Sequence, residues 1–394
     1  MKHTDIINSL SLEQKCALLS GGTVFTTRAL PGKGIPAITL SDGPNGVRKQ
    51  AGAADHLGLN PSVPATCFPT SATVANSWDP ALGEAIGEAL GEEAAAQEVA
   101  VLLGPGLNIK RSPLCGRNFE YFSEDPYLSG KMAASYVRGI QSNGISACPK
   151  HFAVNSQELR RMASDSVVDE RTLRELYLTG FEIVVKEAKP KTIMSSYNLI
   201  NGTYANENRH LLMDILRGEW GFDGAVVTDW GGSNDHALGV QNGSTLEMPA
   251  PGGDAVRELM QAVQSGKITE ADVDARLDEL LELVLTNDLH QQVFRLQQPW
   301  NENYQYGWLF GLVVGWIVIC ILLAFGIIAH KSRNPRILRR LPLPAIPMVL
   351  LGVYAVLYGF HIPLIKQFLG DMTIVHCLMT AASLEGGLRC GLIQ

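Results

Sequence analysis

The sequence lacks the patterns that mark metal, disulfide and dinucleotide-binding proteins. Its seven cysteines are scattered without a C-x-x-C pair, and no histidine stands at metal-ligand spacing. No G-x-G-x-x-G motif follows a strand-like run, which argues against a dinucleotide site. We therefore expect no metal and no cofactor, and we interpret the cysteines as buried free thiols.

Basic residues are also scarce over most of the chain. The 394 residues carry a net charge of -7, yet residues 291–394 hold eight Lys/Arg and three Asp/Glu, a balance of +5. The first 290 residues therefore carry -12. Because phosphate binding needs a basic surface, we expect no nucleic-acid partner. Residues 1–15 lack the apolar run of a signal peptide, so none is expected there.

Strand-like and helix-like segments alternate up to about residue 287. Short apolar runs of strand length occur at 35–40, 99–104, 145–148, 191–196 and 224–228. The helical patterns include 80–98, 169–188 with an N-cap aspartate at its start, and 268–286. This alternation favours parallel strands, and an α/β fold of the (β/α)8 TIM-like barrel type over residues 1–288 fits best. A doubly wound open sheet is the alternative.

The composition changes near residue 290. Residues 289–306 are polar and rich in Gln and Asn, as in a linker. Residues 307–329 then run 23 residues without a charge, which is long enough to span a bilayer. Residues 341–365 form a second candidate span, and 372–394 a weaker third. We therefore expect a multi-pass membrane protein with the lipid bilayer as a partner, and we leave open the side on which the barrel lies.

Polar loops follow the strand-like runs, and in a parallel barrel such loops meet at one face. The run 224–228 ends on Asp229, which is followed by Trp230 and two glycines. A glycosidase needs an ionised carboxylate near the anomeric carbon, and a neighbouring Arg or Lys would keep it charged. An indole suits stacking on a pyranose ring. The other polar candidates at this face are Asp42, Arg117, Glu120, Lys150, His151, Glu158, Arg161 and Tyr197.

Five motifs together carry a family resemblance: SDGPNGVR, GRNFEYFSEDP, CPKHFAVNSQELRRM, MSSYNLING and GFDGAVVTDWGG. They resemble the first domain of glycoside hydrolase family 3, the β-glucosidase group, over about residues 6–287. The resemblance implies retaining hydrolysis of terminal β-D-glucosyl residues in β-glucosides or short β-glucans, through a covalent glycosyl-enzyme on Asp229. It implies sugar binding by Asp42, Arg117, Lys150, His151, Arg161 and Tyr197.

Structural roles are the alternatives for several of these residues. Asp229 could be a helix N-cap, Lys150 and His151 a salt-bridged pair, and Trp230 a core residue. The adjacent Arg160 competes with Arg161 for the arginine of its motif.

The sequence departs from the family in its second carboxyl group. A retaining glycosidase needs an acid/base roughly 5–5.5 Å from the nucleophile. In the family that glutamate usually comes from a second domain, and the segment after residue 287 does not resemble one. Glu120 and Glu158 are nearby carboxylates to which the resemblance gives no acid role. We therefore expect impaired activity unless a partner chain supplies the glutamate. The alternatives are a membrane-tethered sugar-binding or sensor protein, and a gene fusion or frameshift product.

Overall fold

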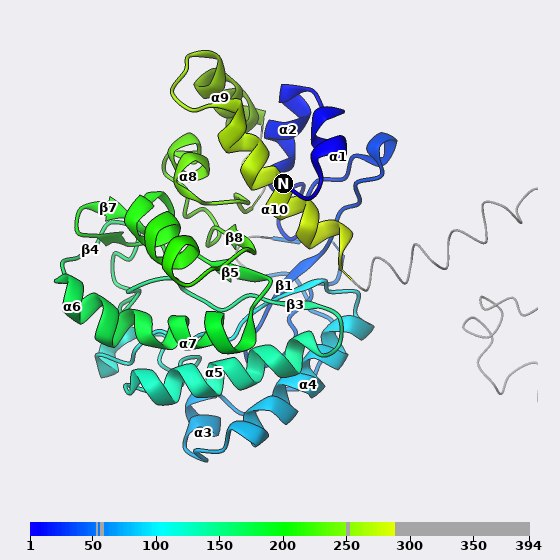
Figure 1. Ribbon diagram of the computed structural model, residues 1–394. Helices are drawn as coiled ribbons and strands as arrows, with labels where there is room; N and C mark the ends of the chain where they lie inside the picture. Colours follow the sequence, from blue (N-terminus) through cyan, green and yellow to red (C-terminus); the bar gives the residue numbers. More distant parts are fainter. Residues whose placement is uncertain (53, 56–58, 250–252, 288–394) are drawn as a thin grey trace, which may run out of the picture. The chain divides into compact units, whose positions relative to one another are not determined.

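The computed structural model describes residues 1–287, except residues 53, 56–58 and 250–252 (Figure 1). The predicted linker at 289–306 and the predicted spans at 307–329, 341–365 and 372–394 lie outside the described residues. The division into these domains therefore stays a prediction. No helix in the described part is long and apolar enough to cross a membrane.

Short parallel strands form the centre of the described part. β1 (Leu40–Asp42), β2 (Val101–Leu103) and β3 (Ser146–Ala147) pair in that order, and β5 (Thr192–Met194) pairs with β8 (Ala225–Val227). Four of the five predicted strand runs contain these strands, whereas β1 begins where the predicted run 35–40 ends. Parallel pairing across a chain of crossover helices confirms the barrel-like α/β architecture.

Single backbone bridges extend this parallel ladder. Phe152 pairs with Ser195, and Leu246 pairs with Val227. The segment 20–26 bridges the residues that precede β1 and those that follow β8. Ser20 pairs in parallel with Glu247, and Thr26 pairs antiparallel with Thr39. The described residues therefore form a TIM-like barrel in which segment 20–26 pairs partly in parallel and partly antiparallel. The physical reason is the turn at Gly22, whose N–H donates to the Thr26 carbonyl at 2.7 Å and reverses the chain.

The helical layer beside the strands is packed closely through glycines. α4 (Pro80–Ala96), α5 (Pro126–Gln141) and α7 (Thr179–Ala188) lie next to one another (Figure 1). A Cβ at Gly87 would lie 2.6 Å from the Tyr136 carbonyl oxygen, and one at Gly139 would lie 2.2 Å from that of Glu84. The backbones of α4 and α5 can therefore approach only because both positions lack a side chain.

The predicted N-cap aspartate of 169–188 is confirmed, and other helices of the described part also begin at side-chain caps. The Asp169 carboxylate accepts from the Thr172 N–H at 3.0 Å and opens a helix of α6 (Glu170–Thr172), π-helical η3 (Leu173–Leu178) and then α7. Ser11 and Gln14 form a capping box on α2 (Leu12–Leu18). α10 (Glu270–Leu285) falls inside the predicted 268–286.

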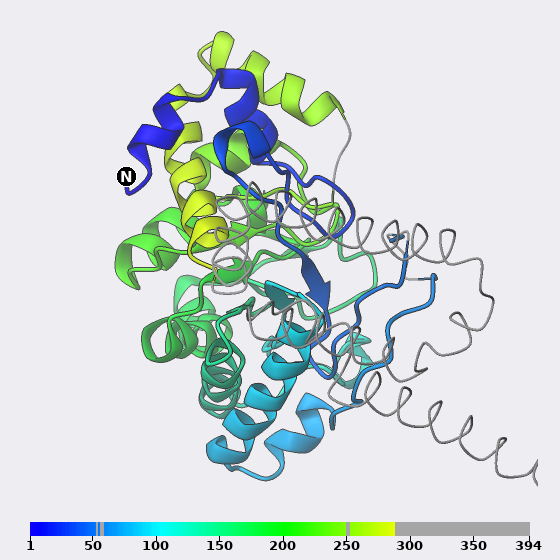
Figure 2. The ribbon, with the colours of Figure 1, turned by 90° about the vertical axis from the view of Figure 1, so that its right-hand side faces the viewer.

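The remaining helices are α1 (Thr4–Asn8), α3 (Ser71–Ala75), π-helical η5 (His210–Glu219), α8 (His236–Asn242) and α9 (Gly253–Gln264). Short 3-10 turns occur at η1 (Pro31–Lys33), η2 (Pro113–Cys115) and η4 (Ala205–Glu207), and the small strands are β4 (Asp165–Ser166), β6 (Leu199–Ile200) and β7 (Thr203–Tyr204). The first and last described helices lie together (Figures 1 and 2). The buried Lys15 ammonium joins α2 to α10 through Glu270 at 2.8 Å and Asp274 at 2.7 Å.

Candidate active site

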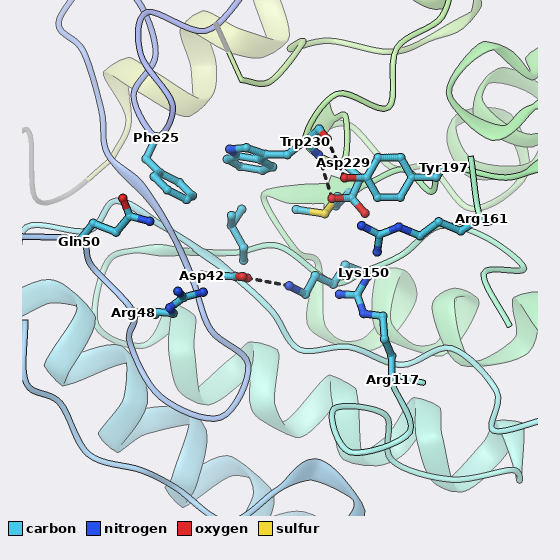
Figure 3. A pocket seen from close by; sticks show the side chains of 12 residues that line it. Phe25, Asp42, Arg48, Gln50, Arg117, Lys150, Arg161, Tyr197, Asp229 and Trp230 are labelled. Atoms are coloured by element: carbon cyan, nitrogen blue, oxygen red, sulfur yellow. Dashed lines mark hydrogen bonds and ion pairs between the residues drawn. The ribbon is translucent and has the colours of Figure 1, made fainter. Parts of the chain in front are cut away.

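A cavity of about 300 Å³ lies where β1, β5 and β8 end (Figure 3). Of the eight residues predicted to act as nucleophile or to contact the sugar, seven line it: Asp42, Arg117, Lys150, Arg161, Tyr197, Asp229 and Trp230. His151 is the exception and is buried behind the lining. The carboxyl ends of parallel strands therefore bring together side chains from five distant motifs, as the barrel interpretation predicts.

Asp229 lies at this cavity with one carboxylate oxygen without a partner. Its Oδ1 accepts from the Trp230 N–H at 2.8 Å, while its Oδ2 has no hydrogen-bond partner within the described residues. Burial raises the pKa of Asp229, and the cations of Arg117, Lys150 and Arg161 oppose this effect without cancelling it. The expected basic neighbours are present, but they do not fully offset burial. Asp229 does not cap a helix, since Asp235 caps α8.

Asp42 and Lys150 form an ion pair across the cavity. The Lys150 Nζ donates to Asp42 Oδ1 at 2.8 Å and lies 3.9 Å from Glu120 Oε2. Burial alone would raise the pKa of Asp42, but the Lys150 ammonium holds it below its ordinary value. For Lys150, burial lowers the pKa, and the attraction to Asp42 and Glu120 outweighs this and raises it. Both groups are therefore charged near neutral pH, and the partner of Lys150 is Asp42 rather than His151.

His151 is held by hydrogen bonds of its backbone and by a hydrogen bond at its ring Nδ1. Its backbone N–H donates to Asn108 Oδ1 at 2.7 Å, and its carbonyl accepts from Asn108 Nδ2 at 2.8 Å. The ring places Nδ1 3.0 Å from the Tyr121 hydroxyl and Nε2 3.6 Å from Asp229 Oδ2. Burial and the nearby cations of Arg117, Lys150 and Arg161 hold the pKa of His151 well below its ordinary value. The imidazole is therefore neutral near pH 7.

Two arginines that line the cavity share the Glu158 carboxylate as an ion-pair partner. Arg161 Nη1 donates to Glu158 Oε2 at 2.7 Å, and its guanidinium lies 4.3 Å from the centre of the Tyr197 ring. Arg117 donates to Glu120, and its Nη1 lies 3.7 Å from Glu158 Oε1. Arg161 lines the cavity and Arg160 does not, so Arg161 is the better candidate of the two.

The aromatic side of the cavity is built around Trp230. Its Nε1 donates to the Val24 carbonyl at 2.7 Å, and its carbonyl accepts from the Tyr197 hydroxyl at 2.6 Å. The Phe25 ring is tilted against it with the ring centres 5.4 Å apart. Trp230 is only 9% exposed and packs with the core, so the core interpretation is correct in part, although the indole also lines the cavity.

Sequence reasoning missed five lining residues: Phe25, Arg48, Gln50, Leu103 and Met194. Arg48 lies within a motif that had been identified, and its charge shortly after a strand was a usable signal. Phe25 gave no such signal, because it lies at the cavity only through the long-range pairing of segment 20–26 with residues 39 and 247.

Within the described residues, no second unpaired carboxyl group lines this cavity. Among the described residues, the carboxylates that line it are Asp42 and Asp229. Asp42 is committed to Lys150 and has a lowered pKa, so it does not suit the role of proton donor. Glu120 and Glu158 do not line the cavity, and each is paired with an arginine that does.

A barrel with a buried carboxylate, cations and an indole around one cavity has the groups that a carbohydrate-processing site uses. The model of the glycosyl hydrolase family 3 N terminal domain matches residues 53–283. The chain belongs to this family.

Similar proteins agree with this assignment. Thermostable beta-glucosidase B of Acetivibrio thermocellus is 52% identical over 301 residues, which are 76% of this chain and 39% of that protein. An exo-alpha-(1->6)-L-arabinopyranosidase of Bifidobacterium longum is 47% identical over 279 residues, 71% of this chain and 37% of that one. The structure of beta-glucosidase 3B from Thermotoga neapolitana with glucose has 40% identity and a TM-score of 0.68, covering 73% of this chain and 43% of that one. The chain thus spans about two fifths of the length of these proteins.

The predicted multi-pass membrane localisation is wrong. The relatives matched over most of this chain are named as glycosidases, and no helix in the described part could span a membrane. The prediction depended on the apolar composition of residues 307–365, which lie outside the described residues. Composition alone measures apolarity and does not identify what surrounds a segment.

Proposed function

We propose that this chain carries the nucleophile and the sugar-binding site of a retaining β-glucosidase. The substrate is a terminal β-D-glucosyl residue of a β-glucoside or a short β-glucan. The observation that carries the proposal is Asp229 Oδ2, an unpartnered carboxylate oxygen beside a 300 Å³ cavity, surrounded by three cations. An oxocarbenium-like transition state forms beside such an oxygen at low cost, because the anion is already desolvated.

In the first step Asp229 Oδ2 bonds to the anomeric carbon while the bond to the leaving oxygen breaks. The leaving oxygen takes a proton from a general acid, and the sugar stays attached to Asp229 as an ester. Water then attacks the same carbon, gives one proton to the base and releases Asp229. Two displacements retain the anomeric configuration.

The remaining lining residues hold the sugar. Asp42 and Lys150 present an acceptor and a donor for adjacent hydroxyls. Behind the lining, the His151 Nε2 lies 3.6 Å from Asp229 Oδ2, the proposed nucleophilic oxygen. Arg117 and Arg161 supply donors on the opposite wall, with Tyr197 under the Arg161 guanidinium. Trp230 supplies a flat face for the pyranose ring.

We propose that the acid/base comes from outside residues 1–287. This fits the lining, where Asp42 and Asp229 are the carboxylates of the described part, and the relatives, which are more than twice as long as the matched region. A glutamate of a partner chain would meet the same chemical need.

Covalent labelling tests the nucleophile without needing the acid. We expect a 2-fluoro-glucoside with an activated leaving group to add one fluoroglucosyl mass to the intact chain, because that leaving group departs unprotonated. Asp229→Asn should not be labelled. Asp223→Asn is the matched control, since Asp223 lies on the same segment with its side chain 89% exposed. Labelling that persists in Asp229→Asn would sink the assignment.

The arabinopyranosidase relative provides a second substrate to compare. An arabinopyranoside with the same activated leaving group should react more slowly if the site is built for glucose, because its ring lacks the exocyclic hydroxymethyl group. Faster reaction of the arabinopyranoside would reassign the sugar. Tight gluconolactone binding without any labelling would instead favour a sugar-binding protein.

A further inference from the structure

Tyr121 is a buried residue beside the site for which the proposed mechanism gives no role. It is fully buried, and the Gly106 backbone lies so close that a Cβ there would be 3.0 Å from a Tyr121 ring carbon. In the described part of the chain, its hydroxyl lies within hydrogen-bond distance of His151 Nδ1, at 3.0 Å. Burial raises the pKa of Tyr121 well above its ordinary value, so the hydroxyl keeps its proton.

The neutral His151 ring carries a single N–H, and two tautomers are available. A proton on Nδ1 would point at Tyr121, and Nε2 would then turn a lone pair toward Asp229 Oδ2, 3.6 Å away. Two acceptors would face each other in a buried site. A proton on Nε2 instead faces the carboxylate, and Nδ1 accepts from the Tyr121 hydroxyl. Only the second arrangement makes both contacts donor to acceptor.

We propose that Tyr121 is a positioning residue whose hydroxyl donates to His151 Nδ1 and so holds the His151 proton on Nε2. This proton faces Asp229 Oδ2, and it would be available to a sugar hydroxyl of the bound substrate. The statement about the sugar rests on the proposed function, whereas the tautomer does not. The charged groups that act on the ring are Asp229 together with Arg117, Lys150 and Arg161.

The tautomer is measurable in the full chain by NMR. Labelling with 15N-histidine gives nine histidines to resolve, and the signal that vanishes in His151→Gln identifies His151. Long-range 1H–15N correlations distinguish a protonated Nε2 from a protonated Nδ1. We expect a neutral ring protonated at Nε2 across roughly pH 5–8, the range in which an ordinary histidine titrates. A wild-type ring protonated at Nδ1 would overturn the proposal.

Tyr121→Phe tests the hydroxyl, with Tyr136→Phe as the matched control. Tyr136 is equally buried, and its hydroxyl has no hydrogen-bond partner in the part of the chain that the structure describes. Losing the donor to Nδ1 removes a bond to the neutral ring, so the His151 signal should protonate at higher pH in Tyr121→Phe. The Tyr136→Phe titration should match wild type.

The labelling rate gives the functional readout. We expect Tyr121→Phe to react with the activated 2-fluoro-glucoside roughly tenfold more slowly, the size of one lost hydrogen bond. Equal titrations and rates in the two phenylalanine variants would reduce Tyr121 to a packing residue. If the NMR result holds and wild type is never labelled, the proposed function fails while the tautomer stands. If Tyr121→Phe does not fold, the wild-type tautomer still decides.

Discussion

A change of leaving group should reveal whether the full chain, acting alone, supplies a general acid. A 2,4-dinitrophenyl β-glucoside departs as a stable anion, whereas the leaving oxygen of cellobiose must be protonated. The cavity lining of the described part contains two carboxylates: Asp229, the proposed nucleophile, and Asp42, held at 2.8 Å by Lys150. Neither of these two side chains suits donation of the proton, so without a donor from outside the described residues this step falls to water.

The size of the effect follows from general acid catalysis. Such catalysis is typically worth 10²–10⁴-fold, or about 3–5 kcal/mol of barrier. We therefore expect turnover of the dinitrophenyl glucoside and a loss of that order for cellobiose, beyond the difference shown by an intact β-glucosidase measured alongside. Initial rates from released dinitrophenolate and from released glucose provide the comparison.

Azide sharpens this test because it is a nucleophile that needs no base. If water attack on the glycosyl-enzyme lacks a base, deglycosylation limits the rate, and azide should accelerate turnover and yield β-glucosyl azide. Cellobiose cleavage at a rate close to that of the activated substrate would refute the reasoning. The acid would then lie within this chain, and Glu158→Gln and Glu120→Gln would be the first variants to measure.

Three further predictions concern binding, pH and stability. Lys150→Ala should weaken gluconolactone binding about ten- to a hundredfold by calorimetry, since a charge-assisted hydrogen bond is lost; an unchanged affinity would assign Lys150 a structural role. The raised pKa of Asp229 means that the nucleophile is ionised only above that pKa, so the labelling rate should fall on acidification at a higher pH than for an ordinary aspartate; a rate that stays flat down to the ordinary range would contradict this. Gly87→Ala should lower the free energy of unfolding by about 1–3 kcal/mol in urea, because its Cβ would press on Tyr136 of α5; Gly32→Ala, which meets nothing within 4 Å, is the control and should leave it nearly unchanged.

The sequence alone determined the elements whose signals are local. Caps at Ser11 and Asp169 start helices because one side chain and the N–H groups two or three residues later suffice. The β-branched run before Asp229 forms the buried strand β8. Seven of the eight residues predicted to act as nucleophile or to contact the sugar reached one cavity, because parallel strands deliver their carboxyl ends to the same face.

Tertiary structure decided what depends on contacts between distant segments. Residues 20–26 pair with both Thr39 and Glu247, and the pairing with Thr39 is antiparallel. This pairing brings Phe25 to the cavity. Lys150 pairs with Asp42, 108 residues away, and Asp229 Oδ2 accepts no hydrogen bond from the part of the chain that the structure describes. Such pairings have no local pattern, since they depend on which side chains remain within about 3 Å after the chain has closed on itself.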